Sequence, residues 1–90
     1  MENKCWLQRC RVCGYDNEFL IWGESGNLPS FEICPCCGVQ FGYSDETEED
    51  CNFYRTFWAQ NEALKWFSPK LRPDNWNWDE QKKLIPRKFK

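Results

Sequence analysis

The first half of the chain alternates short apolar runs with turn residues, a pattern typical of strands. Residues 17–22 include four consecutive strand formers, and residues 30–34 place Phe31 and Ile33 on one face of a half-buried strand. The glycine-rich segment between these two runs predicts a turn, so the strands are expected to pair as an antiparallel hairpin. Residues 39–43 alternate again, which indicates a third short strand.

The second half follows the 3.6-residue period of a helix. Ser44 or Asp45 is expected to cap the first helix, and the acidic residues 48–50 suit the positive end of its dipole. Its apolar stripe consists of Cys51, Tyr54, Phe57 and Trp58, flanked by Phe53. The helix should end near Asn61, because the stripe would otherwise continue into polar residues and asparagine tolerates the left-handed conformation at a helix end.

The remaining chain predicts one further turn and a short last helix. Residues 63–67 are expected to form the turn, and two prolines predict an extended segment at residues 68–75. Asn77 is expected to cap a helix at residues 78–85, and Pro86 to end it.

Two short cysteine turns, each followed by glycine, carry the clearest chemical signal. They are Cys10-Arg11-Val12-Cys13-Gly14 and Cys34-Pro35-Cys36-Cys37-Gly38, with twenty residues between Cys13 and Cys34. Such turns present four sulfurs to one tetrahedral metal ion. We therefore predict that Cys10, Cys13, Cys34 and Cys37 bind zinc or, because the same geometry suits it, iron. A pair of disulfides is the alternative for these cysteines.

The other three of the seven cysteines have weaker signals. Cys5 is expected to be a spare thiol, and Cys51 falls on the helix stripe and should belong to the core. Cys36 lies inside the second turn and should point away from the metal. It is either a thiol activated by nearby backbone N–H groups or a partly buried spectator.

Ninety residues predict one domain, 1–90, whose size makes a metal site an important source of stability. Residues of about 8–44 should form the metal-binding ribbon, and about 45–86 the helical half. The predicted fold class is α+β: a small zinc-ribbon or rubredoxin-like antiparallel hairpin with two C-terminal helices packed on it.

Charge argues against nucleic-acid binding. The formal net charge is −2, and four thiolates with a divalent metal would bring it to about −4. Phosphate backbones are instead bound by basic surfaces. The acidic cluster at residues 45–50 and the basic residues 82–90 are expected to be solvated helix ends and a loosely held tail.

Composition also argues against an enzyme and against membrane association. The chain has no histidine, which removes the usual neutral-pH general base, and a four-thiolate site leaves no metal position open. No apolar run approaches the length of a membrane span and no signal peptide is evident, so a cytoplasmic protein is expected.

Residues 65–73 alternate aromatic, basic and proline residues. Such a segment is typical of an interaction surface, with Trp66 and Phe67 as anchors. The alternative is that these aromatic side chains simply cover the ribbon.

Two resemblances to known families follow from these motifs. Cys10 to Tyr15, Leu28-Pro29 and Cys34 to Gly38 resemble the rubredoxin pattern. Residues 29–43, together with Trp66-Phe67-Ser68-Pro69-Lys70, are similar to a group of uncharacterised small bacterial cysteine-rich proteins that share the Cys-Pro-Cys-Cys turn. Some members of that group are associated with bacterial toxin–immunity systems, which implies an immunity-type role.

The sequence therefore predicts a non-enzymatic zinc-binding protein whose four-cysteine site is structural and which acts through contacts with an unknown protein partner. The alternatives are a rubredoxin-like iron electron carrier and an immunity-type protein of a toxin system. A thiol-redox enzyme acting through Cys36 and a nucleic-acid-binding ribbon are weaker alternatives. The sequence predicts no oligomeric state.

Overall fold

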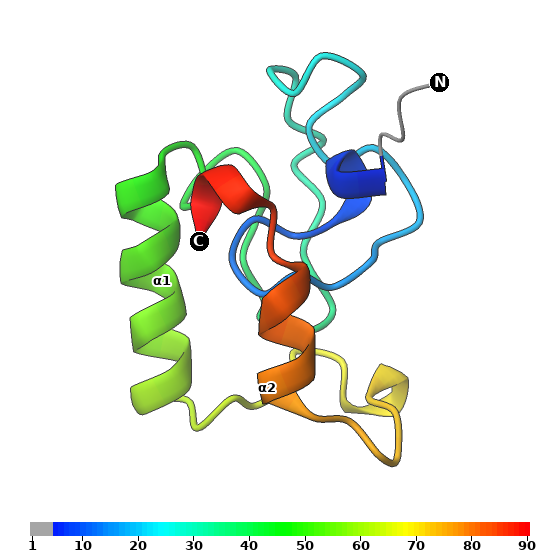
Figure 1. Ribbon diagram of the computed structural model, residues 1–90, viewed down its shortest axis with the longest axis vertical. Helices are drawn as coiled ribbons and strands as arrows, with labels where there is room; N and C mark the ends of the chain where they lie inside the picture. Colours follow the sequence, from blue (N-terminus) through cyan, green and yellow to red (C-terminus); the bar gives the residue numbers. More distant parts are fainter. Residues whose placement is uncertain (1–4) are drawn as a thin grey trace.

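A computed structural model describes residues 5–90 of the protein, with side chains from Trp6 onward (Figure 1). Two α-helices, α1 (Glu48–Gln60) and α2 (Trp78–Gln81), lie in the second half of the chain. Single 3₁₀ turns are η1 (Cys5–Gln8), η2 (Pro69–Leu71), η3 (Lys82–Leu84) and η4 (Arg87–Phe89). Figure 1 shows α1 beside the C-terminal segment, with the loops of the first half behind them and the segment that joins α1 to α2 below.

The predicted zinc-ribbon or rubredoxin-like α+β fold is wrong. Within residues 5–90 the chain forms no strand and no sheet; Arg9 bridges Asp16 and Ile33 bridges Gln40, each as an isolated pair. Glu18 and Phe31 both have φ of 63°, a left-handed conformation that interrupts an extended chain. These residues interrupt the predicted strands at 17–22 and 30–34, and the predicted strand at 39–43, where Gly42 has φ of 104°, does not form either.

Within residues 5–90 the two segments of the expected hairpin form one backbone hydrogen bond, from the Ser30 N–H to the Ile21 carbonyl at 2.9 Å. The Ile21 N–H donates outside the expected hairpin, to the Leu7 carbonyl at 3.2 Å. Phe31 and Ile33, which the pattern placed on a buried face, are 51% and 43% exposed. The alternating pattern thus reflects loop residues that pack individually and not one face of a sheet.

Helix α1 begins slightly later than predicted. Thr47 is its N-cap, and the Thr47 side chain accepts a hydrogen bond from the Asp50 N–H at 3.0 Å. The predicted caps, Ser44 and Asp45, are wrong, because Asp45 is buried in the loop before the helix. Acidic residues 48–50 do occupy the first turn, as expected.

The C-terminal end of α1 lies where it was predicted, but its geometry differs. Asn61 is the C-cap and has φ of −91°, so it is right-handed. The left-handed residues are Ala63 and Leu64, with φ of 51° and 59°. The Leu64 N–H donates to the Trp58 carbonyl at 3.1 Å, and this bond closes the helix end.

The predicted last helix is confirmed in outline. The Asn77 side chain caps α2 by accepting from the Glu80 N–H at 3.1 Å, and η3 follows directly. The segment expected to be extended contains η2. The prediction of a loosely held tail is wrong, because Phe89 is buried and residues 87–89 form η4 against α1.

A cluster of aromatic rings joins the helical half to the cysteine turns. Trp66 packs edge-on against Tyr15 at 5.4 Å and against Trp76 at 5.5 Å between ring centroids, and Trp58 packs against Trp78 at 5.2 Å. Trp66 is 3% exposed. It therefore covers the cysteine turns, which agrees with the covering role that was the alternative to an interaction surface. Its neighbour in sequence, Phe67, is 59% exposed.

Candidate metal centre

Four cysteine sulfurs meet in the interior. The sulfurs of Cys10, Cys13, Cys34 and Cys37 all lie within 4.8 Å of one another. The Cys10–Cys37 and Cys13–Cys34 sulfur pairs are each 3.6 Å apart. A tetrahedron with Zn–S bonds of about 2.3 Å has sulfur–sulfur edges of about 3.8 Å. The four thiols therefore fit a tetrahedral metal ion and could hold one.

Both cysteine turns use the same backbone scheme, displaced by 24 residues (10 to 34, 14 to 38). In the first turn the Cys10 N–H donates to the Tyr15 carbonyl, and the Gly14 N–H donates to the Cys10 carbonyl. The second turn repeats these bonds from Cys34 to Val39 and from Gly38 to Cys34, and all four distances are 2.9 Å. The backbone of each turn thus positions its own two cysteines in the same way.

Each turn needs its glycine. Gly14 and Gly38 have φ of 81° and 82°, where a side chain is strained. Their surroundings differ. A Cβ on Gly14 would lie 2.8 Å from the backbone oxygen of Gln81, whereas a Cβ on Gly38 would lie 3.3 Å from the exposed ring of Phe67.

Cys36 is a core residue and not an exposed thiol. The 24-residue register aligns it with Val12, and both side chains are fully buried. The Cys36 sulfur accepts a hydrogen bond from Gln81 Nε2 at 3.3 Å, and the same nitrogen donates to the Cys13 carbonyl at 2.9 Å. Gln81 therefore joins α2 to both turns.

The remaining cysteines lie apart from the cluster or outside the described side chains. Cys51 on α1 is fully buried, which confirms its predicted core position. Burial raises the pKa of its thiol to about 12, so Cys51 stays protonated. The spare thiol predicted for Cys5 lies outside the side chains that the structure describes.

Burial controls the protonation of the clustered thiols. It raises the pKa of Cys10, and raises those of Cys13 and Cys37 well above the usual value, because the interior disfavours thiolates. Burial acts on Cys34 in the same direction. Hydrogen bonds from the other three side chains outweigh it and hold the pKa of Cys34 well below the usual value. Metal binding must displace protons, so affinity falls as pH falls.

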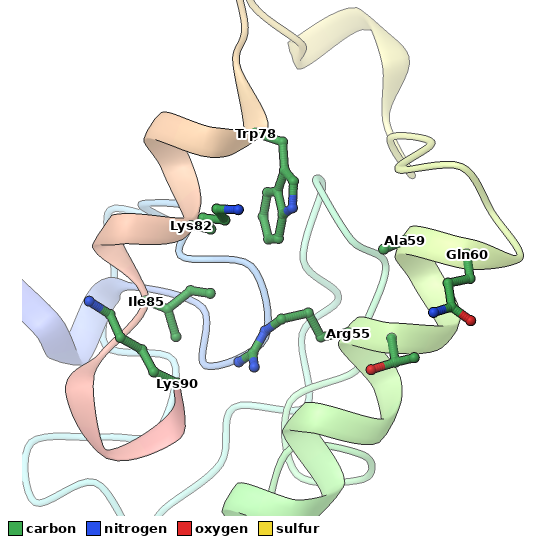
Figure 2. A pocket seen from close by; sticks show the side chains of 8 residues that line it. Arg55, Ala59, Gln60, Trp78, Lys82, Ile85 and Lys90 are labelled. Carbon is green, nitrogen blue, oxygen red and sulfur yellow. The ribbon is translucent and has the colours of Figure 1, made fainter.

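Arg55 fastens α1 to the first turn. Its guanidinium donates to the carbonyls of Val12, Arg11 and Phe89, the last two at 2.9 and 2.7 Å. Figure 2 shows Arg55 extending from α1 toward the C-terminal segment, near Ile85. Burial lowers the pKa of Arg55. The sequence signal for this contact was its position four residues after Cys51, on the same side of the helix.

Arg11, within the first turn, is also buried. Its guanidinium lies between the rings of Trp22 and Phe89, 3.9 and 4.3 Å from their centroids, and donates to the Asp45 carbonyl at 3.1 Å. The Asp45 carboxylate accepts from Trp22 Nε1 at 2.9 Å and from the Gly42 N–H at 2.7 Å. Burial raises the pKa of Asp45 despite these bonds. The sequence analysis did not predict the burial of either charged residue.

Only neutral groups bind the second turn within residues 5–90. Tyr54 Oη donates to the Cys37 carbonyl at 3.2 Å. The backbone N–H groups of Phe67 and Ser68 donate to the carbonyls of Cys36 and Pro35 at 3.0 and 2.8 Å. The two turns therefore have the same pattern of backbone hydrogen bonds but different electrostatic surroundings.

Comparisons with known proteins give two relatives of unknown activity. No protein-family model and no solved structure matches the chain. The chain is similar to "Uncharacterized protein YoaQ" of Bacillus subtilis (strain 168), with 39% identity over 59 residues, 62% of this chain and 47% of that protein. "Uncharacterized protein YozI" of the same strain is 29% identical over 86 residues, 76% of this chain and 69% of that protein.

The chain thus spans about half the length of the first of these relatives. The relatives agree with the expected similarity to small uncharacterised bacterial proteins, and the clustered thiols agree with a cysteine-rich protein. None of the helices within residues 5–90 has the length and apolar character needed to cross a membrane.

Proposed function

We propose that the protein is a non-enzymatic zinc-binding protein in which Cys10, Cys13, Cys34 and Cys37 hold one structural Zn²⁺. The observation that carries the proposal is the burial of four sulfurs within 4.8 Å of one another. Four thiolates complete the coordination of zinc, which leaves no position for a substrate or an activated water. The ion would supply a crosslink between the two turns.

A structural role agrees with the way the rest of the chain packs. Tyr54 and Arg55 on α1, and Gln81 on α2, each donate to backbone carbonyls of the cysteine turns. These acceptors are correctly placed only when the turns are held together. Loss of the ion would therefore release both helices as well as the turns.

The proposed action is through contacts with another protein. Exposed aromatic side chains lie on α1, at Phe57, and on the segment that follows it, at Phe67. Exposed aromatic groups of this kind are enriched at protein interfaces. An immunity-type role rests on the resemblance of the Cys-Pro-Cys-Cys segment alone.

Elemental analysis of protein purified from its native host tests the metal assignment. We expect one zinc per chain, no visible absorption, and loss of the near-ultraviolet tryptophan signal when a chelator removes the ion under reducing conditions. Retention of that signal by metal-free protein would contradict the structural role. One iron per chain with a thiolate-to-iron absorption band and a reversible one-electron couple would favour the electron carrier instead.

A further inference from the structure

A groove beside Cys37 carries a further inference, which rests on the proposed metal site. The groove has a volume of about 350 Å³. Its walls are aromatic and come from α1 and from the segment after it: Tyr54, Phe57, Trp58, Trp66 and Phe67. We call it the Cys37 groove, because that residue lines it.

The metal site is closest to solvent at this groove. Cys37 is 5% exposed, whereas Cys10, Cys13 and Cys34 have no exposed surface. Four thiolates with a divalent ion carry a net charge of −2. That charge is therefore least covered where Cys37 meets the groove.

The buried guanidinium groups lie at the first cysteine turn and not at the second, which contains Cys37. The guanidinium of Arg55 binds the carbonyls of the first turn, and that of Arg11 lies within it. The second turn receives hydrogen bonds from neutral groups alone in the described chain. Glu62 and Lys65 line the groove and cancel each other in net charge, so the site's own charge decides the sign of the field there.

Aromatic faces beside a negative centre favour a cation. A guanidinium suits the groove better than an ammonium, because its flat surface stacks on aromatic rings. The protein contains one such arrangement already, in which the Arg11 guanidinium lies between Trp22 and Phe89. The rings of Phe57 and Phe67 are available for a second, since they are 46% and 59% exposed.

We propose that the Cys37 groove of the metal-loaded protein binds an arginine side chain from an extended, basic segment of a partner protein. The guanidinium stacks on the exposed rings and points toward the second cysteine turn. The partner's backbone lies along the outer edge of the groove, near Glu62.

A second groove provides an internal contrast. It lies between α1 and the C-terminal segment, has a volume of about 410 Å³, and is lined by Arg55, Lys82 and Lys90 with no acidic side chain (Figure 2). Its charge repels a basic segment. Binding of a basic peptide that affects Trp78, which lines this second groove, and leaves Trp66 in the Cys37 groove unaffected would therefore contradict the proposal.

The test uses the full chain loaded with zinc, with one metal per chain verified beforehand. The probe is the peptide acetyl-Gly-Arg-Gly-Arg-Gly-amide, and its control replaces each arginine with neutral, nearly isosteric citrulline. We expect the indole signals of Trp58 and Trp66 in nitrogen-15 NMR spectra to shift, with affinity about tenfold higher for the arginine peptide. Equal affinity for the two peptides would overturn the proposal.

Matched variants test the site itself. Phe57→Ala and Phe67→Ala truncate partly exposed walls and should each weaken binding about fivefold or more. Phe53→Ala removes a neighbouring α1 ring that is 77% exposed and does not line the groove, and it should bind like the unaltered protein. An equal loss for Phe53→Ala would show that binding depends on general hydrophobicity and would contradict the assignment.

Metal exchange tests the role of charge. Ferric iron gives a four-thiolate site of net charge −1 and should weaken binding of the arginine peptide, whereas Co²⁺ should preserve it. Unchanged affinity in the ferric form would contradict the electrostatic part of the proposal. Failure to hold any metal would contradict the proposed function, whereas zinc-loaded protein with no preference for arginine would contradict this inference alone.

Discussion

The two cysteine turns have the same backbone hydrogen bonds and opposite surroundings. The first turn is bound by the guanidinium of Arg55 and covered by α2 and the C-terminal segment. The second is bound by neutral donors, covered by Phe67 and open to a groove at Cys37. Ligand geometry is therefore a property of each local turn, whereas charge and accessibility are set by segments far away in the chain.

Removal of a ligand from either turn should have the largest effect. Cys13→Ser and Cys34→Ser should both lose zinc and with it most of the folding free energy, since structural zinc contributes about 10–16 kcal/mol in small zinc domains. Cys36→Ser is the matched control inside the second turn and should retain one zinc per chain. Elemental analysis and the thermal unfolding midpoint measure this. Full zinc content in Cys13→Ser would show that the turns do not act as one site.

Arg55→Ala should be the next most damaging change. It removes the hydrogen-bond donor of three carbonyl groups, two in the first turn (Arg11 and Val12) and one in the C-terminal segment (Phe89). We expect a loss of about 3 kcal/mol in the free energy of unfolding. Arg55→Lys keeps the charge but not the planar arrangement of donors, and should lose about half as much. Urea unfolding of zinc-loaded protein measures both. Equal losses for the two variants would show that the positive charge by itself contributes nothing, whereas full stability of Arg55→Lys would show that charge alone matters.

Alanine substitution of the two glycines should destabilise the protein by different amounts in the two turns. Gly14→Ala and Gly38→Ala both strain a left-handed residue, at a cost of about 1–2 kcal/mol. Gly14→Ala should cost about 1–2 kcal/mol more, because its methyl group meets backbone atoms of Gln81 and Ile85. The ring of Phe67 beside Gly38 can move away instead. Equal losses in urea unfolding would contradict the difference in covering.

Tyr54→Phe should have the smallest effect, because it removes one neutral hydrogen bond from the second turn and keeps the ring. A loss of about 1 kcal/mol is expected. The zinc content should not change. A loss of unfolding free energy as large as that for Arg55→Ala would contradict the stated difference between the surroundings of the two turns.

The features that could be predicted from sequence are those set by neighbouring residues. The spacing of cysteine and glycine predicted the two turns, and an asparagine directly before the helical segment, Asn77, predicted the cap of α2. Both depend on contacts within a few residues, which a pattern can show. The assignment of Cys10, Cys13, Cys34 and Cys37 as metal ligands remains a prediction, although the structure brings their sulfurs together.

The features that could not be predicted depend on distant partners. Alternation suggested strands, but left-handed residues at Glu18 and Phe31 interrupt them, and nothing local in a glutamate or phenylalanine signals that conformation. The sequence predicted a solvated charge at Asp45 and made no prediction for Arg11. They are buried because Trp22 and Phe89, remote in sequence, supply an aromatic sandwich and a hydrogen-bond donor.

The bond from Gln81 to the first turn has a consequence for the order of folding. It joins residues 68 positions apart, whereas the bonds within each turn join residues four or five positions apart. Short loops close fastest and at the lowest entropic cost. Both turns are therefore expected to form before α2 docks. During synthesis the ribosome makes all four clustered cysteines before α1, so a metal ion bound by them would organise the site onto which the later helices assemble.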